Sequence, residues 1–293
     1  VIGQPRHTYP LAHEVVSAPA PAQPAVRVIA QQPGLLRLAL SLADGEAIWG
    51  FGQRMDAFNL RGRTLETWTT DGWNAMHTSY YAVPFFISSK GYGLFINSPL
   101  RLKFDIGWTQ PGEILIEIPD DGAEVFLLEG TPADVSRAYT ELVGRPRYVP
   151  DWIFRPWVSR NSYLGAYEVD HIVHRMEELG MPVGVVVLEA WEEQLHNFKF
   201  TEYRYPDPKG WLARLKEKDV HVVCWLTSSV WTGTRAYEEA KQKGFLVLND
   251  DGSEHVVRWL ENGRKIDFRK PGAFEWWRDL HKPLVDMGVA GFK

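Results

Sequence analysis

The chain has 293 residues, enough for about two domains, and its 45% hydrophobic and 24% charged residues are typical of a globular protein. The net charge of −5 argues against a nucleic-acid-binding protein, and no apolar run approaches the length of a membrane span, about 18 residues. The single cysteine, Cys224, excludes an internal disulfide, and no Cys/His spacing suits zinc.

The first part of the chain is predicted to form an antiparallel β-sandwich. Residues 1–30 are rich in Ala and Pro, which favours an extended or edge-like segment. Short alternating runs follow, separated by turn sequences such as Lys90-Gly91 and the Asp-Asp-Gly at 120–122. Regular short strands with such turns indicate a sandwich. The predicted strands are 35–40, 81–88, 92–97, 102–106, 113–118 and 123–128.

A helix is expected over residues 132–143. Thr131 is a candidate N-cap, Pro132 occupies the first turn, and Asp134 has the spacing of a capping box. Gly144 and Pro146 end the helix. We therefore expect an N-terminal domain at 1–130, a connecting helix and linker at 131–150, and a second domain at 151–293.

From residue 151 onward, expected strands alternate with expected helices. The strands are 153–159, 183–188, 220–226 and 289–292, and the helices are 167–179, 207–218, 234–243 and 272–287. Apolar strands of this kind are buried on both faces, as in a parallel sheet of a doubly wound or barrel fold. Four strands with three crossovers correspond to half of a (β/α)8 TIM barrel. The predicted fold is therefore a β-sandwich followed by the first half of a barrel, with a small excursion at 245–268.

Polar and aromatic residues follow the ends of the predicted barrel strands. Glu189 and Trp191 come after the second strand, Trp225 comes at the end of the third, and Lys293 follows the fourth. In a barrel, functional groups project from these carboxyl ends. A cup with Trp walls, one carboxylate and a lysine suits a carbohydrate. Ordinary loop starts explain any one end taken alone, whereas four such ends in register favour a functional site.

The motifs of the sequence resemble those of glycoside hydrolase family 31, the family of α-glucosidases and α-xylosidases. The resemblance covers nearly the whole chain, and the order and spacing of the motifs together are specific. In the first domain the motifs are WGFGQR at 49–54, ETWTTDG at 66–72 and VPFFISSKGYG at 83–93. In the second domain they are PDW at 150–152, YPDP at 205–208, VCWL at 223–226, IDF at 266–268 and MGVAGFK at 287–293.

The resemblance implies a retaining, exo-acting α-glycoside hydrolase similar to α-glucosidases. One carboxylate attacks the anomeric carbon, and a second acts as general acid and then as general base, so that water splits a covalent glycosyl-enzyme. In this family the nucleophile is an Asp that closely follows the Phe-Lys corresponding to Phe292-Lys293, and the acid/base Asp lies further on. Neither position falls within this chain, so we expect the chain alone to be a catalytically inactive fragment.

The resemblance also assigns a substrate-binding group to this chain. Lys293 matches a lysine that bonds sugar hydroxyls beside the nucleophile, and Trp225 matches an aromatic residue that lines the −1 pocket. Asp71 lies on a sandwich-domain loop that contacts substrate. Glu189 stands where many relatives have an Asp that bonds the sugar 4-OH, and Trp191 belongs to a stretch that departs from the commoner pattern. These departures leave glucosides, xylosides and galactosides open.

Other site types are less well supported by the residues. His171 and His174 fall off the apolar face of their helix, which favours surface histidines over a metal site. The glycines at 50, 52, 91 and 93 lack the pattern of a dinucleotide-binding loop. Glu189, Glu192 and Glu193 place only one carboxylate at a strand end, which is poor for a cation. We therefore expect no metal and no cofactor.

The partner expected from the sequence is an oligosaccharide or α-glycoside, with no nucleic acid and no membrane. A homo-oligomer and a cytoplasmic location are working expectations, although a chain that does not begin with Met leaves room for a removed leader. An α-xylosidase, an α-galactosidase, a transglycosylase of the same family and a non-catalytic carbohydrate-binding protein remain alternatives. The residues after Lys293 would discriminate an enzyme from a binding protein.

Overall fold

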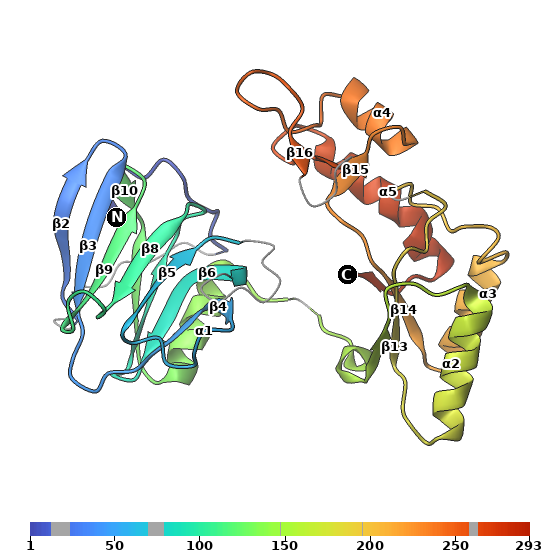
Figure 1. Ribbon diagram of the computed structural model, residues 1–293, viewed down its shortest axis with the longest axis horizontal. Coiled ribbons are helices and arrows are strands. Elements are labelled where there is room, and N and C mark those ends of the chain that lie inside the picture. The colour runs from blue at the N-terminus through green and yellow to red at the C-terminus, as the bar shows by residue number, and fades with distance from the viewer. Residues whose placement is uncertain (13–23, 70–78, 147, 195, 258–262) are drawn as a thin grey trace. The chain divides into compact units, whose positions relative to one another are not determined.

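A computed structural model describes residues 1–12, 24–69, 79–146, 148–194, 196–257 and 263–293. The chain divides into two compact units, Val1–Arg147 and Tyr148–Lys293 (Figure 1). The boundary between the units lies within the linker that the sequence predicts at 131–150. Among the described residues, no helix is both long enough and apolar enough to cross a membrane.

The first unit is an antiparallel β-sandwich, which confirms the predicted fold. Within the described residues, one sheet has the strand order β2-β3-β9-β8-β5, the other has the order β11-β7-β6-β4, and β1 pairs with β10. The strands are β1 Ile2–Gly3, β2 Val26–Gln32, β3 Leu35–Ser41, β4 Ile48–Arg54, β5 Arg63–Thr67, β6 Ser79–Ser88, β7 Tyr92–Ile96, β8 Leu102–Ile106, β9 Glu113–Ile118, β10 Gly122–Ala123 and β11 Val125–Glu129.

Side chains that alternate along the strands build the core between the two sheets. Along β9, Ile114, Ile116 and Ile118 are fully buried, whereas Glu113 and Glu117 on the other face are accessible to solvent. This alternation gives each strand one apolar face toward the core, because successive side chains of a strand point to opposite faces.

The glycines of the WGFGQR motif allow β4 and β6 to approach closely. Gly50 and Gly52 have φ values of 128° and 84°. A Cβ atom on Gly52 would lie 1.8 Å from the carbonyl oxygen of Tyr81, and one on Gly50 would lie 2.7 Å from that of Phe85. The pairing of β4 with β6 shifts register at these residues. Because glycines interrupt the alternation of side chains, the sequence pattern did not predict β4.

Helix α1, Pro132–Val143, begins and ends where the sequence predicts. Thr131 and Asp134 form the expected capping box. Rather than acting only as a connector, the helix packs on the smaller sheet: Tyr139 stacks on Phe85 with ring centroids 4.0 Å apart, and Val135 is buried. Strand β7 is buried along its whole length because α1 covers the face that the core does not.

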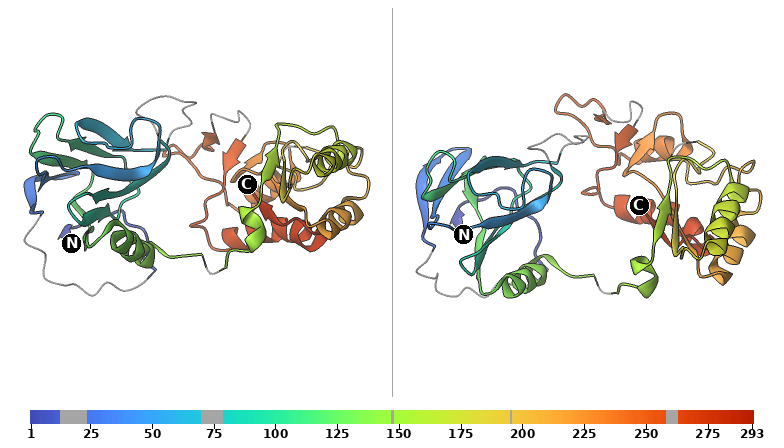
Figure 2. Two further views of the ribbon diagram at one scale, coloured as in Figure 1. Left: turned by 90° about the horizontal axis from the view of Figure 1, so that it is seen from below. Right: turned by 60° about the horizontal axis from the view of Figure 1, so that its bottom comes forward.

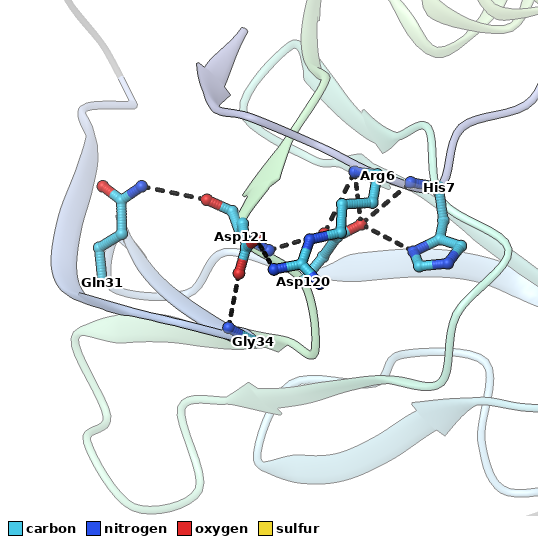
Figure 3. A network of polar contacts seen from close by, with 6 residues as sticks. All are labelled: Arg6, His7, Gln31, Gly34, Asp120 and Asp121. Atoms are coloured by element: carbon cyan, nitrogen blue, oxygen red, sulfur yellow. Dashed lines mark hydrogen bonds and ion pairs between the residues drawn. The ribbon is translucent and has the colours of Figure 1, made fainter.

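A buried carboxylate attaches the N-terminal segment to the sandwich (Figure 3). Asp120 is 3% exposed and accepts the backbone N–H groups of Arg6, His7 and Asp121 at 3.0, 3.1 and 2.7 Å. Burial alone would raise the pKa of Asp120, but these donors and the His7 ring outweigh it and lower the pKa. The resulting stabilisation is present above the ordinary carboxyl pKa and is lost as the pH falls through the depressed value.

The second unit contains a four-stranded parallel sheet in its described part, as expected for the first half of a TIM barrel. The strand order is β12-β13-β14-β18, and each pairing is parallel. Helices α2 and α3 lie side by side on one face of these strands (Figures 1 and 2). The elements are β12 Trp157–Ser159, α2 Ala166–Glu178, β13 Val185–Leu188, α3 Pro208–Glu217, β14 His221–Cys224, α4 Arg235–Gln242, α5 Ala273–Met287 and β18 Gly291–Phe292.

Two local features differ from the expected pattern. The run at 153–159 is a strand only in its last part, because a 3₁₀ helix, Asp151–Phe154, precedes Pro156. The excursion before the last crossover forms an antiparallel sheet in the order β15-β17-β16, with β15 Ser229–Trp231, β16 Val256–Val257 and β17 Gly263–Lys265. This sheet follows directly from the carboxyl end of β14.

The core of the second unit lies between its parallel sheet and its helices. Trp211 of α3 is 1% exposed and donates its indole N–H to Asp170 of α2 at 2.8 Å. Cys224, the single cysteine of the chain, is fully buried at the end of β14. Burial raises the pKa of its thiol far above the ordinary value, and the nearby Glu192 adds to the effect.

The Asp120 network predicts a specific loss of stability in the first unit. Asp120→Ala leaves three backbone N–H groups without their acceptor, so we expect its free energy of unfolding to fall by about 2 kcal/mol. Guanidinium denaturation above about pH 6 measures this change. Asp44→Ala, at an exposed carboxyl group, is the control. Equal stability of the two variants would contradict the role of Asp120.

Candidate functional site

The parallel register of three neighbouring strands brings their carboxyl ends to one level. Cys224 on β14 pairs with Leu188 on β13 and with the last residue of β18. The ladder continues one residue further, where the N–H of Trp225 donates to the carbonyl of Leu188 at 2.8 Å and that of Lys293 donates to the carbonyl of Cys224 at 3.0 Å. Glu189, Trp225 and Lys293 therefore follow three adjacent strand ends.

Glu189 and Lys293 form an ion pair across the end of the sheet. Lys293 Nζ lies 2.5 Å from Glu189 Oε1, and the side chains are 51% and 21% exposed. Both groups remain accessible, so the ammonium can donate and the carboxylate can accept further hydrogen bonds from a polyhydroxylated ligand. The pair supplies the carboxylate and the lysine that the sequence predicts at this edge.

Trp225 lies beside this pair and is half-buried at the end of β14. Its ring centroid is 6.2 Å from that of His196, with an angle of 41° between the rings. The backbone next to it is fixed, because Leu226 donates its N–H to the carbonyl of Lys293 at 3.0 Å. A half-buried indole held in this way can cover an apolar ligand face while its backing ring restricts its movement.

Trp191 lies deeper than the sequence predicts. Its side chain is 1% exposed, its ring packs on Phe200 at 4.8 Å, and its indole N–H donates to the carbonyl of Trp225 at 3.0 Å. The chain leaves the strand at Ala190 with a φ of 50°, and the next side chain enters the core. Through this hydrogen bond, the buried Trp191 holds the backbone of Trp225 in place from the core side. Contact between Trp191 and a ligand stays a prediction, which this burial does not favour.

Sequence reasoning missed the loop that supports these residues. Glu192 is 9% exposed, and its two carboxylate oxygens accept the backbone N–H groups of His196 and Phe198, both at 2.8 Å. Burial raises the pKa of Glu192 to about 7, although these hydrogen bonds oppose the shift. The residues alone suggest only a cation-binding role for Glu192, which they support poorly. The available signal was a Glu that directly follows Trp191 in a stretch that also contains Phe198 and Phe200.

His196 belongs to the same buried arrangement. It is fully buried, and its Nε2 lies 3.3 Å from Thr227 Oγ1. Burial lowers the pKa of His196 to about 4, and the charge of Lys265 contributes, so the ring is neutral near neutral pH. A neutral ring adds no charge behind Trp225 in that range.

The sequence also draws attention to Asp71, His171 and His174. Asp71 lies outside the described residues. The side chain of Arg54, from the WGFGQR motif, is buried in the first unit, with Nη1 3.7 Å from the carboxylate of Asp56. His171 and His174 are both exposed on α2. Over the described ranges, no group of three or more His, Cys, Asp or Glu residues is arranged to hold a metal ion.

Comparisons with known proteins identify the family. The model of the glycosyl hydrolases family 31 TIM-barrel domain matches residues 146–293, and that of the glycosyl hydrolase 31 N-terminal galactose mutarotase-like domain matches residues 15–105. One match thus covers the second unit, and the other lies within the first unit. The chain belongs to glycosyl hydrolase family 31, which confirms the resemblance seen in its motifs.

The alignments with individual relatives include nearly all of this chain but less than half of each relative's length. Alpha-xylosidase XylQ of Lactiplantibacillus pentosus is 29% identical over 88% of this chain and 35% of its own length. An alpha-glucosidase of Saccharolobus solfataricus is 26% identical over 99% and 43%. The cycloalternan-degrading enzyme from Trueperella pyogenes, solved in complex with isomaltose, is 26% identical with a TM-score of 0.81 over 88% and 43%. The chain thus spans about a third of the xylosidase.

The buried Glu192 carboxyl group predicts a pH-dependent stability. Its folded pKa of about 7 exceeds the ordinary 4.5, so its contribution is fully present below 4.5 and is lost as the pH rises through 7. Relative to Glu192→Gln, the wild type should lose on the order of 2–3 kcal/mol of unfolding free energy between about pH 5 and about pH 8.

Guanidinium denaturation of both proteins at the two pH values measures this difference. His196, whose lowered pKa gives the opposite pH dependence, is present in both proteins. Glu193→Gln, at the exposed neighbouring carboxyl group, is the control and should follow the wild type. A Glu192→Gln variant with the same pH dependence as the wild type would contradict the burial of the charge.

Proposed function

We propose that this chain is the substrate-binding part of a retaining, exo-acting α-glycoside hydrolase. The observation that carries the proposal is the Glu189–Lys293 ion pair beside Trp225, at the joined ends of β13, β14 and β18. Membership of glycosyl hydrolase family 31 and relatives named as alpha-xylosidase and alpha-glucosidase support it. The substrate is an oligosaccharide or glycoside with a terminal α-linked sugar.

Each of the three residues has a distinct part in binding. Trp225 covers an apolar face of the terminal sugar, since stacked rings bury C–H groups without competing for hydroxyls. Glu189 accepts hydrogen bonds from sugar hydroxyls, and Lys293 donates to them. Because the ion pair holds both side chains in place before the sugar arrives, binding orders fewer rotatable bonds.

The reacting carboxyl groups are proposed to lie beyond Lys293. An aspartate close after Lys293 attacks the anomeric carbon as the glycosidic bond breaks, and a second carboxylic acid about 5 Å away gives its proton to the leaving oxygen. That second group then takes a proton from water, whose oxygen replaces the aspartate at the anomeric carbon. The ammonium of Lys293 favours the ionised form of the nucleophile. Without those carboxyl groups, residues 1–293 alone should be inactive.

The experiment that tests the proposal is a screen of nitrophenyl α-glycosides with the full-length protein. The screen includes glucosides, xylosides and galactosides, and NMR follows the anomeric configuration of the first sugar product. We expect release of an α-sugar from at least one of them. Release of the β-anomer, or no cleavage of any α-glycoside, would overturn the proposed function. High concentrations of acceptor sugar separate hydrolysis from transglycosylation.

Replacement of Trp225 tests the stacking surface. In the full-length protein, Trp225→Ala removes the half-buried indole, and we expect substrate binding and turnover to weaken by on the order of 1–3 kcal/mol. The measurement is kcat/KM for the α-glycoside that the wild type cleaves. Trp108→Ala, at an exposed Trp of the first unit, is the control. A kcat/KM within about twofold of the wild type would show that Trp225 does not contact the sugar.

Replacement of Glu189 separates ligand binding from stability. Because Lys293 is half exposed, Glu189→Gln should change the free energy of unfolding by less than about 1 kcal/mol. The same variant loses a charged acceptor, so its kcat/KM should fall by about tenfold or more. Thermal denaturation and steady-state kinetics of one preparation measure both quantities. A stable variant with full activity would show that Glu189 does not bind the substrate.

A further inference from the structure

Besides Ala190, two further residues of the loop that follows β13 lie in the left-handed region of the backbone. His196 has a φ of 61° and Phe198 a φ of 58°. Residues with a Cβ atom rarely adopt this conformation, which costs about 1–2 kcal/mol for each. Such strain persists where other interactions hold the backbone in place. The N–H groups of these same two residues are the donors to the carboxylate of Glu192.

The loop closes around this carboxylate. Glu192 and Phe200 form an isolated antiparallel bridge, the N–H of Glu193 donates to the carbonyl of Lys199 at 2.9 Å, and the N–H of Thr201 donates to that of Trp191 at 3.1 Å. The carboxylate of Glu192 thus occupies the interior of a loop whose two ends, at 191–193 and 199–201, are hydrogen-bonded to each other. Each oxygen satisfies one strained backbone donor, so removal of either acceptor leaves a buried N–H unpaired.

One side of the loop leads to Trp225. The ring of His196 is fully buried, lies 6.2 Å from that of Trp225, and places Nε2 3.3 Å from Thr227 Oγ1. We therefore expect a change in the backbone at His196 to displace its imidazole ring. That ring lies behind the indole of Trp225 and beside the hydroxyl of Thr227.

The other side of the loop leads to Lys293. The ring of Phe198 packs edge-on against Trp277 at 5.3 Å and against His281 at 5.0 Å, both on α5. His281 is fixed by its Nδ1–H, which donates to the carbonyl of Trp277 at 2.7 Å, and its ring meets Phe292 at 4.8 Å. Phe292 directly precedes Lys293. Continuous contacts thus connect Glu192 with the residues behind both predicted sugar-binding side chains.

We propose that Glu192 is a positioning residue for the sugar site, whose carboxylate sets the loop that backs both Trp225 and Lys293. This inference rests on the proposed function for its kinetic consequences. Glu192 itself does not touch the sugar, since its side chain is enclosed by the loop. Its replacement acts through the placement of Trp225 and Lys293, which a general loss of stability would not reproduce.

A double-mutant cycle in the full-length protein tests the proposal, with kcat/KM for a cleaved α-glycoside as the readout. Glu192→Gln keeps one carbonyl acceptor but turns an amide toward the second backbone N–H, so we expect kcat/KM to fall by about tenfold. Glu193→Gln, the exposed neighbour, should stay within about twofold of the wild type. In a Trp225→Ala background, the loss caused by Glu192→Gln should be at least about threefold smaller, because one of its two targets is gone.

Several results would overturn the proposal. Glu192→Gln with wild-type kcat/KM is one, and an equal loss with and without Trp225 is another. If Glu192→Gln does not fold, His196→Asn takes its place in the experiment. Asn tolerates the left-handed backbone and keeps the backbone N–H that donates to Glu192. The substitution removes only the imidazole ring behind Trp225. We expect a loss of about fivefold that is again smaller in the Trp225→Ala background. Full activity of His196→Asn would refute the connection to Trp225.

Amide hydrogen exchange separates this proposal from the proposed function. If the wild type cleaves no α-glycoside, the function fails, and the positioning role is judged on exchange alone. In Glu192→Gln, segments 222–227 and 289–293 should exchange faster than in Glu193→Gln by about tenfold, since their backing loop is released. If His196→Asn replaces that variant, segment 222–227 should exchange faster by about tenfold, since the ring behind Trp225 is gone. Unchanged exchange in these segments would overturn the positioning role whatever the activity.

Discussion

The hydrogen-bond ladder between β13, β14 and β18 is the constraint on which the candidate site depends. It sets the three strand ends at one level, so Glu189, Trp225 and Lys293 emerge side by side although more than a hundred residues separate the first from the last. A shift of β18 by one residue would turn Lys293 to the other face of the sheet and break its ion pair with Glu189. The site is therefore as precise as the register of the sheet that carries it.

Each unit contains a buried carboxylate that accepts hydrogen bonds from otherwise unpaired backbone N–H groups. Asp120 and Glu192 each accept backbone N–H groups from irregular segments that no sheet or helix partner satisfies. Their pKa values nevertheless move in opposite directions. At Asp120 the hydrogen bonds outweigh burial, and at Glu192 burial outweighs the hydrogen bonds. Ionisation of Asp120 therefore stabilises the first unit as the pH rises. Ionisation of Glu192 destabilises the second unit as the pH rises.

The sequence predicted the features that depend on periodicity. The strand at 113–118, the helix at 132–143 and the parallel strands before Glu189, Trp225 and Lys293 follow from side-chain alternation, capping and apolar runs. It did not predict β4, because close backbone approach at Gly50 and Gly52 replaces alternation there. The burial of Trp191 and the contacts of Glu192 were also missed. Both depend on left-handed backbone turns at non-glycine residues, for which the local sequence gives no signal.

Cys224 gives this molecule a built-in reporter. It is the chain's single thiol, it is fully buried at the end of β14, and its raised pKa keeps it in the unreactive protonated form. An alkylating reagent can modify it only after the sheet around it opens. The rate of modification therefore measures the opening of the second unit alone, without an introduced label and without interference from the sandwich.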